Sequence, residues 1–339
     1  SFGYWNQEGI VATDISNYER FNVRINSEHK VTKWLTFGEN VGYSHQKSVG
    51  LGNTNSEFGG PLSSAINLDP ITPVIVTDPD VLNTAPYSNQ PDIIRDANGN
   101  PYGISKWVGQ EMANPLAYIQ TRLGNYGWSD DFVGNVYAEI KIIKGLKIRS
   151  TVGSKIAFWG YESFTPVSYL NSTTINSKNS FSRGSNRGFN FNVENTISYA
   201  NKINKHDFEV LLGNGAYQDD WSVNVNVTKW DIPATSFDEA SMNWSVPTDQ
   251  ITAGGGEGTV HKVLSLFSRI NYNYDGKYLL TAVFRRDGSS RFGSNNRFGF
   301  FPSASAGWIV SQENFWPVNN VVNFVKIRGG YGVVGNDNI

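Results

Sequence analysis

The segment VHKVLSLFSRINYNYDGKYLLTAVFRRDGSSRFGSNNRFGFFPSASAGW, residues 260–308, decides the fold. Its first two parts alternate polar residues with apolar or aromatic ones, which is typical of strands with one buried face. Asp275-Gly276 lies between them and predicts a tight type I′ hairpin turn. The next connection, Arg286 to Gly293, is long, charged and rich in glycine, and a third segment starts at Phe301-Pro302. Short turns that alternate with long loops are typical of outer-membrane β-barrels.

The composition of the 339-residue chain excludes several classes of protein. The net charge of −2 and the pI near 6.1 give no electrostatic footprint for nucleic acid. Charged residues are 17%, below the roughly 25% of soluble domains, whereas Trp 10, Tyr 16, Phe 20 and Gly 34 are many. Mean hydropathy is −0.37, and no apolar run is long enough for a transmembrane helix. Cysteine is absent, which excludes disulfides and thiol chemistry. The first residues show no signal-peptide pattern, so we expect that a leader was removed or that the chain is a piece of a longer one.

Period-2 alternation recurs along the chain and predicts about 11 long strands, counting a first one at Phe2–Ile10. We expect short turns near residues 27–33, 142–145, 200–205 and 274–277, and a longer one at 311–323. We expect long loops near residues 46–128, 157–187, 218–259 and 287–299, the third with a local strand at 221–227. The first loop holds eight of the 13 prolines, and Asn98-Gly99 would turn a local hairpin there.

Strand length and charge favour a membrane barrel over a β-sandwich. Most predicted strands run 9–13 residues, and a tilted membrane strand needs roughly 9–11, whereas sandwich strands have about 5–6. Their polar sides carry too many charges for a dry core but suit a water-filled or plugged lumen. These charged residues are Arg24, Lys147, Arg149, Lys155 and Glu194.

An odd number of strands cannot close an antiparallel barrel, because the first and last strands would meet in parallel. An open sheet edge is tolerated in neither lipid nor water. We therefore predict an all-β, transmembrane antiparallel β-barrel of which about 11 strands of 22 are present, with long extracellular loops. Residues 1–339 are expected to be part of this barrel domain, with the plug domain and the other strands outside the chain.

Several motifs resemble the SusC/RagA family of TonB-linked outer-membrane transporters. The resemblance is specific over Lys277–Ala282, Arg285–Gly293, Arg297–Trp308 and Lys326–Asn336, although Ser294 and Phe298 depart from the commoner family residues. Weaker matches are Asn6–Ile10, Lys33–Leu35 and Asn114–Ala117. The motif residues that we expect to have a structural role are Arg285, Arg286, Asp287, Gly288, Arg291, Gly293, Pro302, Gly307 and Trp308.

The resemblance implies a multi-pass barrel in the outer membrane of a Gram-negative bacterium, among the Bacteroidota. It implies contact with membrane lipid, an N-terminal plug that couples to TonB, and a SusD-like surface lipoprotein as partner. The implied cargo is an oligosaccharide or a peptide. No nucleic acid is expected as a partner.

Candidate binding residues are the aromatic rings of the predicted loops. Exposed tryptophans stack on the apolar faces of sugars, although each is also typical of an interfacial girdle or a loop core. The six candidates are Trp107, Trp128, Trp159, Trp221, Trp230 and Trp244. Arg285, Arg286, Asp287 and Arg291 form the densest charge group, which either contacts cargo or the plug or shapes an external hairpin.

Neither a metal nor a cofactor is predicted. Asp130-Asp131, Asp219-Asp220 and the pair Asp78 and Asp80 carry enough carboxylates for Ca²⁺ but match no calcium motif, so solvated loop carboxylates are the simpler interpretation. The four histidines are far apart in the sequence, and no catalytic Ser motif is present, so an enzyme is not expected.

Two other classes remain as alternatives. One is a secreted, aromatic-rich β-domain that binds carbohydrate without transport. The other is a glycan hydrolase, which needs paired carboxylates on neighbouring strands; the candidates Glu139 and Glu194 lie on separate segments without a supporting motif.

Overall fold

The computed structural model describes residues 1–9, 15–50, 60–108, 112–317 and 321–337. Ile10, the end of the first predicted strand, lies outside the described residues, as do residues 318–320 of the predicted turn at 311–323. The main strands are β1 (Phe2–Glu8), β2 (Asn17–Lys30), β3 (Leu35–Val49), β4 (Tyr126–Ile143), β5 (Leu146–Thr165), β8 (Ser180–Ile203), β9 (His206–Trp230), β10 (Ile251–Glu257), β11 (His261–Tyr274), β12 (Tyr278–Ser289), β13 (Phe298–Ile309) and β14 (Lys326–Gly332).

The remaining described elements are short and lie in the connections. They are α1 (Pro61–Asn67), α2 (Pro79–Leu82), α3 (Pro115–Gln120), β6 (Ser168–Tyr169), β7 (Ile175–Asn176) and the 3-10 turns η2 (Thr248–Gln250) and η3 (Val310–Gln312). Among the described residues, none of the helices has the length and apolar character needed to cross a membrane.

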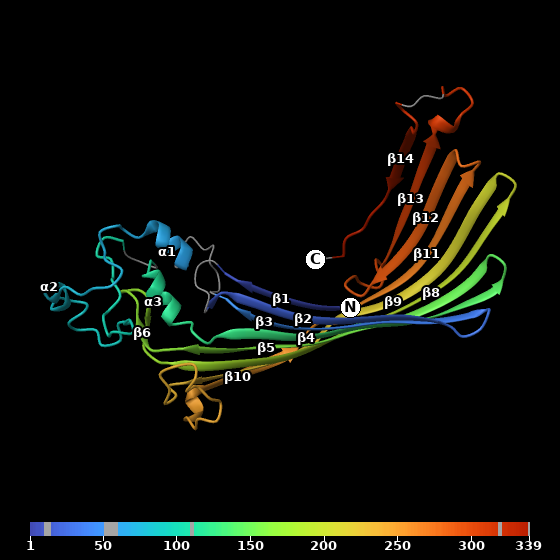
Figure 1. Ribbon diagram of the computed structural model, residues 1–339. Coiled ribbons are helices and arrows are strands. Elements are labelled where there is room, and N and C mark those ends of the chain that lie inside the picture. The colour runs from blue at the N-terminus through green and yellow to red at the C-terminus, as the bar shows by residue number, and fades with distance from the viewer. Residues whose placement is uncertain (10–14, 51–59, 109–111, 318–320, 338–339) are drawn as a thin grey trace.

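One antiparallel sheet contains all the main strands. Its order is β1-β2-β3-β4-β5-β8-β9-β11-β12-β13-β14, and β10 pairs with the far part of β9. The predicted number of about 11 strands is therefore confirmed for the described chain. Figure 1 shows the sheet strongly curved, with β11 to β14 rising away from the other strands. β1 and β14 form the two edges of the sheet within the described residues.

Connections of two kinds gather at opposite ends of the strands (Figure 1). We call the end with the helices α1 to α3 and the segment before β10 the loop end. The opposite end, where tight turns join β4 to β5 and β8 to β9, is the turn end. At the turn between β11 and β12, Asp275 and Gly276 have φ of 55° and 73°, as a type I′ turn requires. The turn predicted at Asp275-Gly276 is confirmed.

Strand alternation gives the sheet two different faces. The apolar face carries one continuous row across four strands, in which Val23 is level with Tyr43, and Phe132 and Ile156 follow. The rings of Tyr43 and Phe132 lie 4.8 Å apart. Large side chains of this face stay exposed, such as Val41 at 49% and Leu266 at 51%. Soluble proteins rarely leave so wide an apolar surface uncovered. The other face, which we call the polar face, carries charged side chains such as Arg24, Lys147 and Glu194.

The apolar face forms a band that ends in polar residues. On β5 its members run from Leu146 to Ile156, which spans about 25 Å at roughly 3.3 Å per residue and a strand tilt near 40°. Directly above that band, toward the loop end, one row contains His45, Asp130 and Arg187. The band therefore has about the height of the lipid-facing surface of an outer-membrane barrel.

Two of the predicted long loops are wrong in extent. β5 and β8 pair from Leu146, which lies opposite Tyr199, as far as Thr165, which lies opposite Ser180. The loop predicted at 157–187 therefore shrinks to the residues between those strands. The predicted local strand at 221–227 is the continuation of β9, which is 25 residues long. Beyond the apolar band these strands run along the loop-end segments, where Phe164 and Phe181 pack against Ile232 and Ala234. The exposed apolar row that guided the prediction therefore ends there, although backbone pairing continues.

The long loop predicted near 46–128 is built of compact local structure in its described part. Val76, Tyr87, Ile93 and Tyr169 form one small apolar core. Gly99 has φ of 84°, and the backbone N–H of Gly99 donates to the Asp96 carbonyl at 3.0 Å. The hairpin turn expected at Asn98-Gly99 is thereby confirmed.

Candidate functional site

The six candidate tryptophans do not form one surface. Trp107 lies in the loop-end structure with 76% of its surface exposed. Trp128 of β4 and Trp221 of β9 lie on the apolar side. Their register partners on the neighbouring strands, Gly160 and Phe189, lie on that side too. Trp159 lies on the polar face of β5. Trp230 ends β9, and the indole N–H of Trp244 donates to the Glu239 carbonyl at 3.0 Å in the next connection.

The charged family motif is divided between two faces. Arg285 lies on the polar face, where its Nε donates to Asp287 at 2.6 Å and its Nη2 to the hydroxyl of fully buried Ser265 at 3.0 Å. Arg286 points to the apolar side and lies 4.4 Å above the ring of Phe298. Arg291 is in the β12–β13 connection. Four charges that are close in sequence thus meet three different environments, because neighbouring strand residues point to opposite faces.

Gly288 and Gly307 lie within β12 and β13, and Gly293 lies in the connection between them. Pro302 and Trp308 are both on β13. Pro302 is level with Phe284, and the indole N–H of Trp308 donates to Glu313 at 3.1 Å. The motif therefore stabilises hairpins at both ends of the strands.

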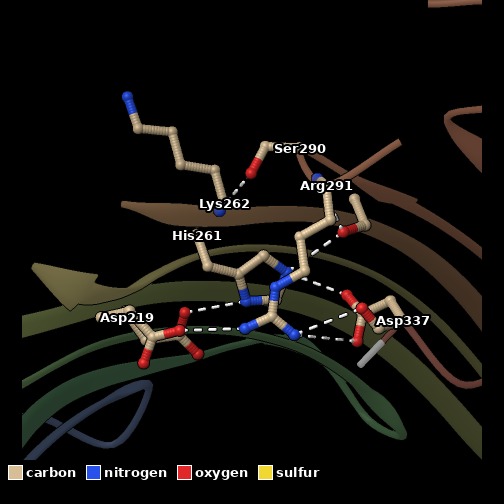
Figure 2. Close-up of polar contacts among 8 residues, drawn as sticks. Asp219, His261, Lys262, Ser290, Arg291 and Asp337 are labelled. Carbon is tan, nitrogen blue, oxygen red and sulfur yellow. Dashed lines mark hydrogen bonds and ion pairs between the residues drawn. The ribbon is translucent and has the colours of Figure 1, made fainter. Parts of the chain in front are cut away.

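The ionic group around His261 joins four segments at the loop end of the polar face (Figure 2). The Nδ1 of His261 lies 2.9 Å from Asp219 of β9, and its Nε2 lies 2.8 Å from Asp337, which follows β14. Arg291 donates to Asp220 at 3.0 Å and to the Asp337 carbonyl at 3.2 Å. His261 is only 8% exposed. Sequence reasoning missed Asp337, which is 76 residues away from His261 and has no recognisable motif of its own.

These contacts place both ring nitrogens of His261 within hydrogen-bond distance of a carboxylate. An ionised carboxylate only accepts hydrogen bonds, and a neutral imidazole has one donor. Both carboxylate contacts are therefore hydrogen bonds only when both ring nitrogens carry a proton. Hydrogen bonds from Ser289, and then from His261, hold the pKa of Asp337 below its usual range, with Arg291 adding charge attraction. The arrangement is a charge-compensated connection between β9, β11 and the segment after β14.

Asp219, Asp220 and His261 place their ligand atoms within 4.8 Å of one another, the spacing of a cation site. The side chains of Asp220 and His261 already have ionic partners, so a cation would compete with Arg291 and Asp337. The other acidic pairs are not arranged as a site. Asp130 and Asp131 lie in β4 rather than in a loop, and Asp78 accepts from the N–H of Asp80 to cap α2.

The two acids considered for hydrolysis each have a partner of their own. Glu139 lies 3.7 Å from Lys147, and Glu194 accepts from the hydroxyl of Tyr217 at 3.1 Å. Both belong to the polar face, where they contribute to its mixed charges.

A hollow of about 530 Å³ opens on the polar face beside the bend of β9. β9 bends there because two of its residues, Asp219 and Asp220, oppose one residue of β8, and Asp220 has φ of 58°. The hollow is lined by Lys155, Ala157, Trp159, Gly188, Asn190, Asp220, Trp221, Ser222, Gly258 and Thr259. An indole ring surrounded by amide, ammonium and hydroxyl groups is typical of small-molecule sites.

The comparisons with known proteins agree with this architecture. TonB-dependent receptor P26 of Formosa agariphila is 30% identical over 341 residues, which cover 100% of this chain and 31% of that protein. TonB-dependent receptor SusC of Bacteroides thetaiotaomicron is 27% identical over 346 residues, covering 100% and 32%. The structure of the RagAB peptide transporter matches with a TM-score of 0.75 at 23% identity and covers 100% of this chain and 35% of that one. No family model matches.

The two-faced, curved antiparallel sheet and these matches define the chain as part of an outer-membrane-type β-barrel. The resemblance to the SusC/RagA family is confirmed to this extent: curated TonB-dependent receptors, SusC among them, match over the whole chain, and the RagAB structure shares its fold. It spans about a third of the length of the relatives it matches.

Proposed function

We propose that the chain is part of the wall of a TonB-dependent transporter that imports a bulky nutrient, an oligosaccharide or a peptide, across the outer membrane. The observation that carries this proposal is the exposed apolar band opposite a charged polar face. An apolar band about 25 Å tall fits a bilayer, and a face with paired charges fits a hydrated or plugged lumen. The names of the relatives, which are receptors and transporters, support the proposal.

Residues 1–339 would form half of a 22-stranded barrel, with β1 and β14 joined to strands outside the chain. A strand edge cannot stay unpaired within a bilayer, which supports this arrangement. The loop end would face outward, because long loops of outer-membrane barrels are extracellular. A SusD-like lipoprotein is the proposed partner at that end, and TonB would act through a plug.

Uptake by cells tests the proposal. Deleting the gene for the intact transporter should abolish growth on its cargo, and deleting TonB should have the same effect. A transporter in detergent should co-purify with a lipoprotein. Growth that is unaffected by both deletions contradicts the proposal. A chain that stays monodisperse without detergent also contradicts it, because that behaviour is expected of a secreted carbohydrate-binding domain.

A further inference from the structure

Two aromatic side chains form a flat surface on the polar face of β5. Trp159 and Tyr161 are two residues apart, so they point to the same side about 7 Å from one another. Trp159 lies over Gly188 of β8, where an added Cβ would be 3.1 Å from the indole Cζ3. Tyr161 lies in the same way over Gly184, where a Cβ would collide with the phenol ring. Both rings therefore lie flat along the sheet.

Among the residues that the structure describes, no cation lies above either ring, unlike Tyr137 and Phe267 of the same face. Arg149 lies 3.7 Å above the ring of Tyr137, and Arg285 lies 5.8 Å above that of Phe267. Trp159 and Tyr161 are 36% and 38% exposed. Within the described ranges, neither of the two rings is paired with a cation or with another ring.

Polar groups surround this surface without covering it. Asn190 and Ser222 line the hollow beside Trp159, and Asn186 lies level with Trp159 on β8. Lys155, also in the hollow, is held by Asp131 at 2.8 Å. An aromatic surface bordered by amides, a hydroxyl and an ion pair fits a ligand that has a flat apolar face and many hydroxyl groups at its edge.

We infer that Trp159 and Tyr161 form an oligosaccharide subsite, with sugar rings stacked on the two side chains and hydroxyl groups bound by Asn190 and Lys155. An extended peptide fits less well, because peptides bind sheets by pairing with a free edge. At this position β5 pairs with both β4 and β8, and β8 also pairs with β9. This inference rests on the proposed transport function and chooses between its two classes of cargo.

Binding to the intact transporter, purified in detergent, tests the subsite. An array of oligosaccharides and a library of ten-residue peptides serve as probes. We expect at least one oligosaccharide to bind, with affinity reduced tenfold or more by Trp159→Ala and several-fold by Tyr161→Ala. Trp159→Phe keeps a ring over Gly188 and should recover part of the loss. Asn190→Ala leaves both rings in place and should weaken binding about threefold or more.

Trp128→Ala is the matched control, because Trp128 packs over Gly160 in the same way, 3.0 Å from an added Cβ, but on the apolar side. Its affinity should stay within twofold of the unchanged protein. Binding of peptides alone, or unchanged oligosaccharide affinity in both Trp159→Ala and Asn190→Ala, overturns the inference. An equal loss in Trp128→Ala also overturns it. TonB-dependent uptake of a peptide would leave the proposed transport intact while the subsite fails.

Discussion

The side chain of Asn179 connects two loop-end segments, and its removal should open them locally. Asn179 precedes β8 and is only 8% exposed. Its amide nitrogen donates to the carbonyls of Ile232 and Ala234 at 2.8 and 2.6 Å, and its amide oxygen accepts from the N–H of Ile232 at 2.8 Å. The connection after β9 then packs Ile232 and Ala234 against Phe181.

Asn179→Ala leaves three buried backbone groups without these partners. At about 1 kcal/mol of net stabilisation for each hydrogen bond, the loss is about 3 kcal/mol. That free energy corresponds to a roughly 100-fold increase in the open population of the connection. The strands should stay intact, because their ladder does not depend on this side chain, so the opening is local.

Hydrogen exchange followed by mass spectrometry, on the intact transporter in detergent, measures this opening. Amides of residues 231–246 should exchange roughly 100-fold faster in Asn179→Ala. Asn201→Ala is the control, because that exposed amide lies near the turn end, where it donates to the hydroxyl of Tyr199 at 3.1 Å and accepts from the N–H of Lys202 at 2.8 Å. An acceleration of less than about threefold after Asn179→Ala, or an equal one after Asn201→Ala, would refute the reasoning.

Three further changes have definite expected results. The pKa of Glu313 is held below its ordinary value of 4.5, first by the hydroxyl of Tyr278 and then by Trp308 and Lys277. The ionised carboxylate stabilises the folded state at pH values above the ordinary pKa, and this stabilisation is lost as the pH falls through the lower pKa of the folded state. Glu313→Gln should therefore flatten the change in unfolding temperature between pH 7 and pH 3. His261→Gln should increase proteolysis and exchange of residues 333–337, because Asp337 loses its contact with the imidazole at 2.8 Å; unchanged protection would contradict the connection described. Gly276→Ala should cost about 1 kcal/mol because of its positive φ, as measured by thermal unfolding, whereas Gly254→Ala, which meets open space, should cost less.

The class of fold was predictable because strand alternation is a local property. The rows Phe21-Val23-Ile25 and Leu264-Leu266 repeat every two residues, and one such repeat is enough to divide a strand into two faces. Asp275-Gly276 defined a turn for the same reason, since the backbone preference resides in the two residues themselves. The ends of β5, β8 and β9 were not predictable from the sequence. Strand pairing beyond the apolar band needs only the backbone of a partner strand and requires no particular pattern of side chains.

The candidate binding residues were predictable by type but not by position. Trp128 and Trp159 are both strand tryptophans that pack on glycine, and composition alone treats them alike. Only their register assigns them to opposite faces of the sheet. The contact between Asp337 and His261 was even less predictable from the sequence, because it depends on the curvature of strands that are distant in sequence.

The sequence by itself determined that this chain is a long, antiparallel, two-faced sheet of about 11 strands with short and long connections in alternation. Periodicity and turn residues carry that information locally, and hydrophobic burial enforces it. The tertiary structure decided which side chains meet on the polar face, how the bend at Asp219-Asp220 forms a hollow beside Trp159, and which charges connect the loop end. Those contacts join residues whose spacing in the sequence is arbitrary, so only the register and curvature of the whole sheet specify them.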